Sequence, residues 1–361
     1  MMNADEFGQR VLEWFDAHGR KHLPWQQNPT PYRVWVSEIM LQQTQVVTVV
    51  PYYRRFVERF PNIRALAEAD LDEVLSLWAG LGYYARARNL HRAAGILRDR
   101  HGGEMPLGIA LVQALPGIGR STAGAILALS TGQRQPVLDG NIKRLLARFA
   151  AVPGWPGQAS VLARLWALAE CYTPTERVAD YTQAMMDLGA LVCAPRRPDC
   201  RLCPLAMGCV AHAQNREMDF PGAKPRRDLP VRATRMVMVR LATREILLER
   251  RPPVGVWGGL WSFPECPLEA DVVDWCQERL GLRVAIQPFW KSLRHTFSHF
   301  HLDITPVPVI AEAECAKAVL EGERFVWYKS DDVQRLGMAA PVRGLLTALT
   351  DDLLNYEDRN E

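Results

Sequence analysis

Four cysteines lie close together in the stretch CAPRRPDCRLCPLAMGC. Cys193, Cys200, Cys203 and Cys209 are separated by six, two and five residues. In a chain with no export signal, cysteines grouped in this way favour a bound metal over disulfides. The usual zinc signature has two Cys-x2-Cys pairs and this stretch has one, so the spacing favours an iron-sulfur cluster and leaves zinc as the alternative. Either metal would have a structural role.

A glycine pair in LPGIGRSTAGAIL, residues 115–127, is a second candidate. The preceding Leu107, Leu111 and Leu115 recur every four positions, which predicts a helix, whereas a dinucleotide-binding fingerprint needs a strand there. We therefore expect a helix-hairpin-helix over about residues 107–131. Gly117 and Gly119 would adopt backbone angles closed to other residues, and the free amides at the start of the second helix would suit a phosphate. A tight turn without a ligand is the alternative.

Two carboxyl groups have sequence surroundings that could set their ionisation. Glu38 lies in the apolar, helix-like run VWVSEIML, and an acid buried there tends to stay protonated. Asp139 precedes the run NIKRLLARF and is a natural N-cap, where helix-end amides favour the ionised form. The alternatives are a glutamate on a solvated face and a cap with no further role.

The elements that must position these residues divide the chain into two parts. At 361 residues the chain is long for one core, so we expect two domains. Residues 1–214 show helical periodicity, and residues 215–232, rich in proline and charge, read as a linker. Residues 233–361 contain runs typical of strands, such as RMVMVRLA and EILLER. The predicted fold is an all-α domain followed by an α+β domain. Two apolar helix faces are predicted in the first, Phe7, Val11, Trp14, Phe15 and Leu71, Val74, Leu75, Trp78.

The composition, 48% hydrophobic and 23% charged, is that of a globular protein. We find no apolar run near the roughly 20 residues of a membrane span and no signal peptide, so we expect a cytoplasmic protein. Residues 1–228 hold 27 Lys plus Arg against 21 Asp plus Glu, which makes this part the basic one. The remaining cysteines are scattered, and we assign them no role: Cys171, Cys266, Cys276 and Cys315.

A helix-hairpin-helix followed about seventy residues later by Cys-x6-Cys-x2-Cys-x5-Cys resembles the endonuclease III superfamily of DNA glycosylases. Nearly the whole chain is similar to the MutY type, the adenine DNA glycosylases that act on adenine opposite 8-oxoguanine. The matching stretches, besides the hairpin, are LPWQ (23–26), VWVSEIMLQQTQV (34–46), GLGYYARARNLH (80–91), VLDGNIKR (137–144), QAMMDLGALVC (183–193) and FSHFHLD (297–303).

This resemblance implies a hydrolase of base excision repair. Its substrate would be adenine paired with 8-oxoguanine or guanine in double-stranded DNA, and its product an abasic site. The resemblance also implies one 4Fe-4S cluster bound by the four grouped cysteines. We expect a DNA-associated monomer without membrane contact, and the sequence indicates no protein partner.

The resemblance places catalytic carboxyl groups at Glu38 and Asp139. Breaking the glycosidic bond through an oxocarbenium-like transition state needs one group to protonate the base and another to stabilise the cation. Two carboxyls in opposite environments supply both. Relatives that also cut the strand carry a lysine where this chain has Ser121, so the amine for a Schiff base is missing and we expect base removal alone. Lys143 can contact phosphate, with a solvated lysine as the alternative.

Other positions are carried over as contacts with DNA or the excised base, because the base must leave the stack before an acid can reach it. Gln42, Gln43 and Tyr83 match family residues that enter the duplex near the opposing base. A place in an aromatic core is the alternative for Tyr83. Trp25 and Gln183 match residues that line the adenine pocket.

The second domain contains VWGGLWSFPE, residues 256–265, which resembles the glycine-rich start of a Nudix fold. The region that would hold magnesium in a pyrophosphatase, ADVVDWCQERLGL, lacks the paired glutamates of the REUxEE core. We therefore interpret this domain as a lesion-recognition module. Ser298 and His299 match the family's contact with 8-oxoguanine, and core histidines are the alternative for His299 and His301.

Three other functions are less consistent with the sequence. Ser121 disfavours a glycosylase with lyase activity on damaged pyrimidines. A noncatalytic iron-sulfur DNA sensor would leave Glu38 and Asp139 dispensable. A nucleotide pyrophosphatase lacks its glutamates.

Overall fold

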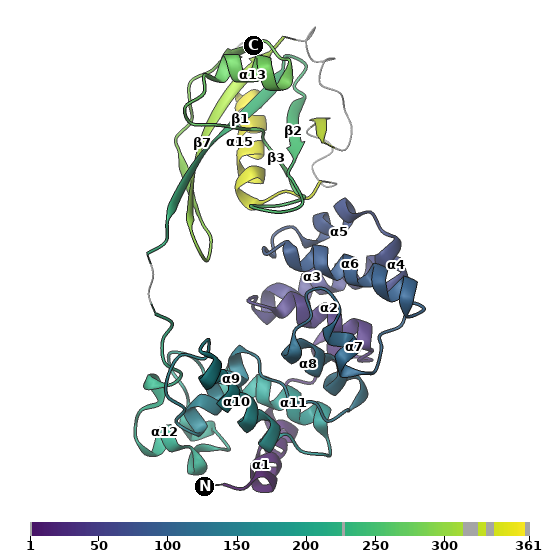
Figure 1. Ribbon diagram of the computed structural model, residues 1–361, viewed down its shortest axis with the longest axis vertical. Helices are drawn as coiled ribbons and strands as arrows, with labels where there is room; N and C mark the ends of the chain where they lie inside the picture. Colours follow the sequence, from purple (N-terminus) through teal and green to yellow (C-terminus); the bar gives the residue numbers. More distant parts are fainter. Residues whose placement is uncertain (1, 226–227, 313–323, 330–335, 358–361) are drawn as a thin grey trace. The chain divides into compact units, whose positions relative to one another are not determined.

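The computed structural model describes residues 2–225, 228–312, 324–329 and 336–357 (Figure 1). Cys315 and the linker residues 226 and 227 lie outside this described part. The chain divides into two compact units, residues 1–68 with 89–226 and residues 69–88 with 227–361. Helices come first along the chain and a mixed sheet with helices follows, so the predicted order of an α domain and an α+β domain is confirmed.

The first unit is helical. Asn3 caps α1 by accepting the amide of Glu6, and the predicted face of this helix, from Phe7 to Phe15, is buried. The elements wholly within this unit are α1 (Ala4–His18), η1 (Pro24–Gln26), α2 (Pro31–Leu41), α3 (Val46–Arg59), α4 (Ile63–Glu68), α7 (Ile109–Gln113), α8 (Arg120–Thr131), α9 (Gly140–Phe149), α10 (Ala159–Tyr172), α11 (Val178–Asp187), η2 (Leu188–Val192), η3 (Cys200–Leu202), η4 (Ala206–Gly208), α12 (Val210–Ala213) and η5 (Glu217–Asp219).

The second unit combines a sheet with helices. Helix α6 (Ala85–Arg100) begins in this unit and continues into the first. The other elements are α5 (Leu71–Trp78), β1 (Val231–Leu241), β2 (Ile246–Arg250), β3 (Trp261–Ser262), β4 (Glu265–Cys266), α13 (Val272–Leu280), β5 (Val284–Ile286), β6 (Leu293–Thr296), β7 (His301–Ala311), β8 (Phe325–Tyr328) and α15 (Ala340–Glu357).

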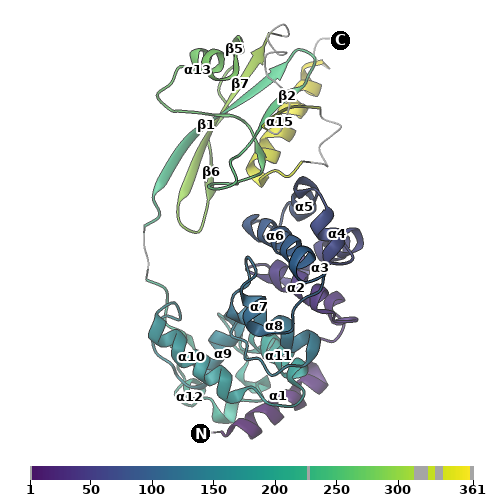
Figure 2. The same ribbon diagram turned by 45° about the vertical axis from the view of Figure 1, so that its right-hand side comes forward.

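The sheet is organised around β1 and β7, which Figures 1 and 2 show as its long strands. These two strands pair in parallel from Val231 opposite His301 to Leu241 opposite Ala311. The strand order through the sheet is β3-β2-β1-β7-β5, with β4, β6 and β8 paired to β1, β7 and β2. Residues 236–239 of β1 are all buried, as expected for a central strand covered on both faces.

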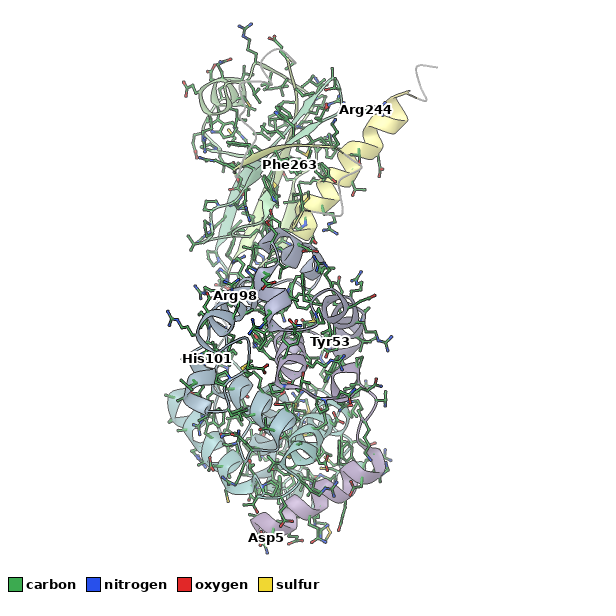
Figure 3. All side chains as sticks on the ribbon, turned by 90° about the vertical axis from the view of Figure 1, so that its right-hand side faces the viewer. Asp5, Tyr53, Arg98, His101, Arg244 and Phe263 are labelled. Carbon is green, nitrogen blue, oxygen red and sulfur yellow. The ribbon has the colours of Figure 1, made fainter. Side chains whose placement is uncertain are left out.

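Each unit has its own core. In the first, α1 and helices α9 to α11 share one cluster of buried apolar side chains. In the second, α13 packs against alternate residues of β1 and β7. Figure 3 labels one buried side chain in each unit, Tyr53 and Phe263. Within the described residues, no helix has the length and apolarity needed to cross a membrane.

Candidate functional site

Helix α2 carries Glu38 into the interior of the first unit. Thr30 caps this helix and Pro31 occupies its first turn, which fixes where the helix starts. The neighbours of Glu38 from Val34 to Met40 are largely buried, while Glu38 itself remains partly accessible to solvent. Burial raises the pKa of Glu38 to about 8, and the nearby carboxyl of Asp139 adds to that rise.

Asp139 is the N-cap of α9, as the sequence predicts. Its Oδ1 accepts the amide of Ile142 at 2.7 Å. Burial raises the pKa of Asp139 above its ordinary value of 3.8, and this rise is opposed by the amides of Ile142 and Asn141 and by the charges of Arg144 and Lys143. Backbone donors and cations therefore offset part of the effect of burial on this carboxyl group.

Burial raises the pKa of both carboxyl groups, but they differ in what opposes that rise. Only apolar burial and a like charge act on Glu38, so its neutral form is favoured at neutral pH. Asp139 has amides and two cations that stabilise its anion. Such a pair can supply a proton donor and a fixed negative charge in one reaction.

The hairpin between α7 and α8 differs in part from the prediction. Gly117 has φ +79°, and a Cβ there would lie 2.8 Å from the Cβ of Asn89, so a glycine is required. Gly119 has φ −90° and no atom within 4 Å of such a Cβ, so the expectation of a special backbone angle is wrong at this position. The space beside Gly119 leaves the start of α8 open to a partner.

The predicted helical stripe of leucines before the hairpin also differs from the structure. Helix α7 begins only at Ile109, and Leu107 and Leu111 are 59% and 53% exposed. Of the three leucines only Leu115 is buried, together with Val112, which is not part of the stripe. A spacing of four drifts around a helix of 3.6 residues per turn, and α7 is too short to bury every leucine of the run.

Ser121 connects the hairpin to the segment that precedes Asp139. Its hydroxyl oxygen accepts the backbone amide of Leu138 at 3.1 Å. The serine therefore has a structural partner one residue away from the capping carboxylate. A lysine at this position would lose that hydrogen bond and would bring an amine close to the same segment.

The four grouped cysteines line one pocket of the first unit. All four are free thiols. Burial raises the pKa of Cys200 to about 11 and that of Cys203 to about 12, with the other cysteines of the group contributing. Thiolates gathered in such a place need positive charge among them, which an iron-sulfur cluster supplies. The donor set therefore fits a metal cluster. His212 and Glu217 line the same pocket and pair at 2.6 Å.

Arg148, which the sequence analysis did not single out, ties this pocket to the residues that follow it. Its guanidinium is buried and donates to the Cys193 Sγ at 3.3 Å and to the carbonyl oxygens of Ala194 and Phe220 at 2.8 and 3.0 Å. A buried arginine with several acceptors rigidifies the segments that it joins. The only sequence signal was an arginine inside the apolar stripe of α9.

The residues predicted to line an adenine pocket lie in the interior of the first unit. Trp25 is buried and makes an edge contact with Tyr53 at 5.4 Å between ring centroids. Gln183 is also buried, and its amide donates to Asp187 Oδ1 at 2.8 Å. Asp187 is fully buried and paired with Arg20 at 2.6 Å, a network that the sequence analysis missed.

The residues predicted to contact DNA are more accessible. Gln42 ends α2 and donates to Thr122 Oγ1 at 3.4 Å, and Gln43 is exposed in a left-handed backbone conformation, φ +58°. Lys143 is half-buried on α9. In the second unit, Tyr83 also has a left-handed backbone, φ +50°, and is 52% exposed, so the aromatic-core alternative for it is wrong.

The turn between β6 and β7 carries Ser298 and His299, which are both exposed. The Ser298 hydroxyl lies 3.4 Å from His299 Nδ1. Beneath them, the rings of Phe297 and Phe300 stack at 4.5 Å. The core alternative for His299 is therefore wrong, whereas His301 is half-buried on β7.

The two parts of the chain match two known families. Residues 36–171 match the HhH-GPD superfamily of base excision DNA repair proteins, and residues 235–348 match the NUDIX domain. The first match covers Glu38, the hairpin and Asp139. The second covers the sheet of the second unit and the turn with Ser298.

Adenine DNA glycosylases are similar over nearly the whole chain. The enzyme of Buchnera aphidicola subsp. Schizaphis graminum is 35% identical over 344 residues, 94% of this chain and 97% of the relative. The Homo sapiens enzyme is 33% identical over 82% of this chain and 65% of its own length.

Solved structures resemble the helical part. A thermostable thymine-DNA glycosylase has a TM-score of 0.53 and 25% identity, over 58% of this chain and 97% of that one. A non-covalent endonuclease III–DNA complex has a TM-score of 0.50 and 21% identity, over 60% of this chain and 99% of that one, which supports the fold alone.

Proposed function

Since this chain belongs to the adenine DNA glycosylases, we propose that it removes adenine opposite 8-oxoguanine or guanine in duplex DNA and leaves an uncut strand with an abasic site. Members of this family are hydrolases of base excision repair that cleave the N-glycosidic bond of adenine. The observation that carries the catalytic part of the proposal is the raised pKa of Glu38 beside Asp139.

In the proposed reaction, neutral Glu38 gives its proton to a ring nitrogen of adenine. The bond between the sugar C1′ and the base then breaks, and its electron pair leaves with adenine. The Asp139 carboxylate stabilises the sugar cation. Water adds to C1′ and loses a proton, which returns to Glu38. A protonated acid whose pKa lies near the working pH suits this role.

We propose that the reaction stops at this point because Ser121 offers no amine. An amine near C1′ can form a Schiff base that leads to strand cleavage. The Ser121 hydroxyl is already engaged with the amide of Leu138, which supports a positioning role.

We also propose that Cys193, Cys200, Cys203 and Cys209 bind one 4Fe-4S cluster. When bound, the cluster would close this loop and neutralise its thiolates. Arg148 would hold the loop in place through its bonds to Cys193 and Ala194.

Five residues are proposed as contacts with phosphate or the duplex. The space beside Gly119 leaves the start of α8 open, which suits a phosphate; Gly117 supplies the positive φ of the turn before it, and Lys143 adds a charge near Asp139. Gln43 and Tyr83 are exposed and held in left-handed backbone conformations, which are strained for residues other than glycine and are common at functional sites. We assign them to the duplex near the opposing base.

Three residues are assigned to bases. Trp25 and Gln183 would line the adenine pocket. Gln42, at the C-terminal end of α2, is assigned with Gln43 and Tyr83 to the duplex near the opposing base. This assignment rests on the family positions.

In the second unit, Ser298 and His299 are proposed to read the lesion. Adenine is a normal base, so a pocket that reads adenine alone would attack every A·T pair. 8-oxoguanine differs from guanine by its C8 carbonyl and N7 proton, which a hydroxyl or an imidazole can recognise. Helix α13, in the region where a pyrophosphatase needs its glutamates, carries only Glu278, which supports binding without hydrolysis.

The test is adenine release under single-turnover conditions from matched duplexes with adenine opposite 8-oxoguanine, guanine or thymine. We expect release that is fastest opposite 8-oxoguanine and an intact strand until alkali is added. Glu38→Gln is the inactive control. Cleaved strand without alkali would contradict the assignment of Ser121, and equal rates opposite all three bases would contradict lesion reading.

A further inference from the structure

Residues 69–88 lie in the middle of the helical sequence but belong to the same compact unit as residues 227–361. This segment contains α5, the loop with Tyr83 and the start of α6. Three of its polar side chains, from Asp72, Tyr84 and Arg88, bond to the sheet part of the unit. We call this stretch the Tyr83 segment.

Asp72 makes the first of these anchors. Its Oδ1 accepts Arg250 Nη2 at 3.0 Å, and its Oδ2 accepts the indole of Trp261 at 3.3 Å. Both members of the ion pair are mostly buried, with 22% and 28% of their side chains exposed. One carboxylate thus joins α5 to β2 and β3.

Tyr84 and Arg88 make the other two anchors. The Tyr84 hydroxyl donates to the carbonyl of Met338 at 2.8 Å, and this side chain is buried. The Arg88 guanidinium donates to the carbonyl of Gly258. Both acceptors are backbone carbonyl oxygens of the sheet part, and a backbone carbonyl cannot move away by a change of side-chain rotamer.

The contact surface is also closely fitted. A Cβ built on Gly337 would lie 2.7 Å from the Cβ of Leu75 on α5, closer than real Cβ contacts allow. The absence of a side chain at Gly337 therefore lets α5 approach the segment just before α15. Packing of this kind resists displacement, because any side chain added at the contact must move one of the partners.

Within the segment, the loop that presents Tyr83 is itself tightly constrained. Gly80, Gly82 and Tyr83 all have positive φ, +105°, +70° and +50°. The indole of Trp78 donates to the Gly82 carbonyl at 3.2 Å, and Arg86 donates to the same carbonyl at 3.1 Å. A tyrosine in this conformation persists only where its surroundings determine it.

We propose that Asp72, Tyr84 and Arg88 are positioning residues that mount Tyr83 on the same rigid body as the turn with Ser298 and His299. This inference rests on the proposed function, in which both groups contact the opposing base. If Tyr83 and the turn with Ser298 and His299 belong to one rigid unit, they do not have to be positioned relative to each other when they bind the opposing base. Less binding energy is then lost to conformational entropy, and more of it contributes to the preference for the lesion.

The test is a double-mutant cycle in the full-length protein. Tyr84→Phe deletes one anchoring hydroxyl, and Tyr328→Phe deletes a buried hydroxyl from β8 as the matched control. The readout is the ratio of single-turnover adenine release opposite 8-oxoguanine to that opposite guanine. We expect Tyr84→Phe to lower the ratio about fivefold, the effect of one hydrogen bond, and Tyr328→Phe to leave it unchanged.

In a Tyr83→Ala background, Tyr84→Phe should change the ratio no further, because its effect passes through Tyr83. The same fivefold loss in that background, or no loss in the native one, would overturn the inference. If the unsubstituted protein releases adenine from neither duplex, the proposed function fails instead.

A second measurement tests the anchoring of the Tyr83 segment and does not depend on enzymatic activity. Gly337→Ala should force α5 away from the segment that contains Gly337 and speed hydrogen exchange of amides 72–88 by about fivefold or more, while amides of α9 keep their protection. Unchanged exchange in residues 72–88 would refute the anchoring. Equal acceleration in both segments would show general destabilisation and would refute it as well.

Discussion

Replacing Glu38 by glutamine is expected to remove activity and to stabilise the protein. Glutamine keeps the shape of the neutral acid but has no proton to give, so adenine release should fall by roughly 10² to 10⁴-fold. DNA binding should persist, because phosphate contacts supply most of the affinity. The expected gain in stability arises because glutamine, unlike Glu38, cannot ionise in the buried site of the folded protein.

The magnitude comes from the pKa of Glu38, about 8 in the folded protein against an ordinary value of 4.5. Because the folded pKa is raised, the neutral carboxyl contributes its full stability below about pH 4.5 and that contribution is lost as the pH rises to about 8. The loss is about 1.4 kcal/mol per pH unit, hence about 3 kcal/mol at pH 7 and about 5 kcal/mol above pH 8. The glutamine variant has no such loss.

The assay is urea unfolding of both proteins at several pH values between 5.5 and 8.5, with Glu58→Gln as a control on the exposed face of α3. We expect the stability advantage of Glu38→Gln to grow with pH and the slopes of unfolding against urea to stay equal. Parallel pH profiles for the two proteins would refute the reasoning, because they would show that Glu38 titrates as an ordinary carboxyl.

Asp139→Asn should abolish adenine release without loss of stability in urea unfolding, because asparagine caps a helix as well as aspartate. Protein made with ample iron should be brown and hold about four irons per chain, and stoichiometric zinc instead would refute the cluster. Ser121→Lys should give a borohydride-trappable DNA adduct that the native protein does not form on gels. Ser298→Ala with His299→Ala should shrink the preference for 8-oxoguanine over guanine by about fivefold per lost hydrogen bond, and an unchanged ratio of single-turnover rates would contradict lesion reading.

The sequence was most informative where local chemistry and fold agree. Asp139 could be recognised as a cap because a short acid directly precedes an amphipathic helix, and the structure has that bond to Ile142. The apolar surroundings of Glu38 predicted a protonated acid, and its raised pKa agrees. The two parts of the chain were also separable, because the helical period gives way to strand-like runs near residue 231.

Other features depend on contacts between distant residues and could not be predicted. Leu107 and Leu111 fit a helical stripe, but the helix is too short to bury them. Arg148 looks like any helix arginine until the segment near Phe220 folds back to it. The anchoring of residues 69–88 cannot be recognised from sequence periodicity, because each hydrogen-bond partner of the anchoring side chains lies more than 150 residues further along the chain.

The distance along the chain between Tyr84 and Met338, 254 residues, has a consequence during synthesis. At typical rates of translation, the ribosome needs roughly 10 to 50 s after making Tyr84 to reach Met338, whose carbonyl accepts the Tyr84 hydroxyl. For that time α5 lacks the contact between Leu75 and the segment at Gly337, although the helices around it can already fold. A nascent chain in this state exposes apolar surface and is a natural client for chaperones. Folding of this part should therefore depend on synthesis of the segment around Met338, even though its own sequence is helical.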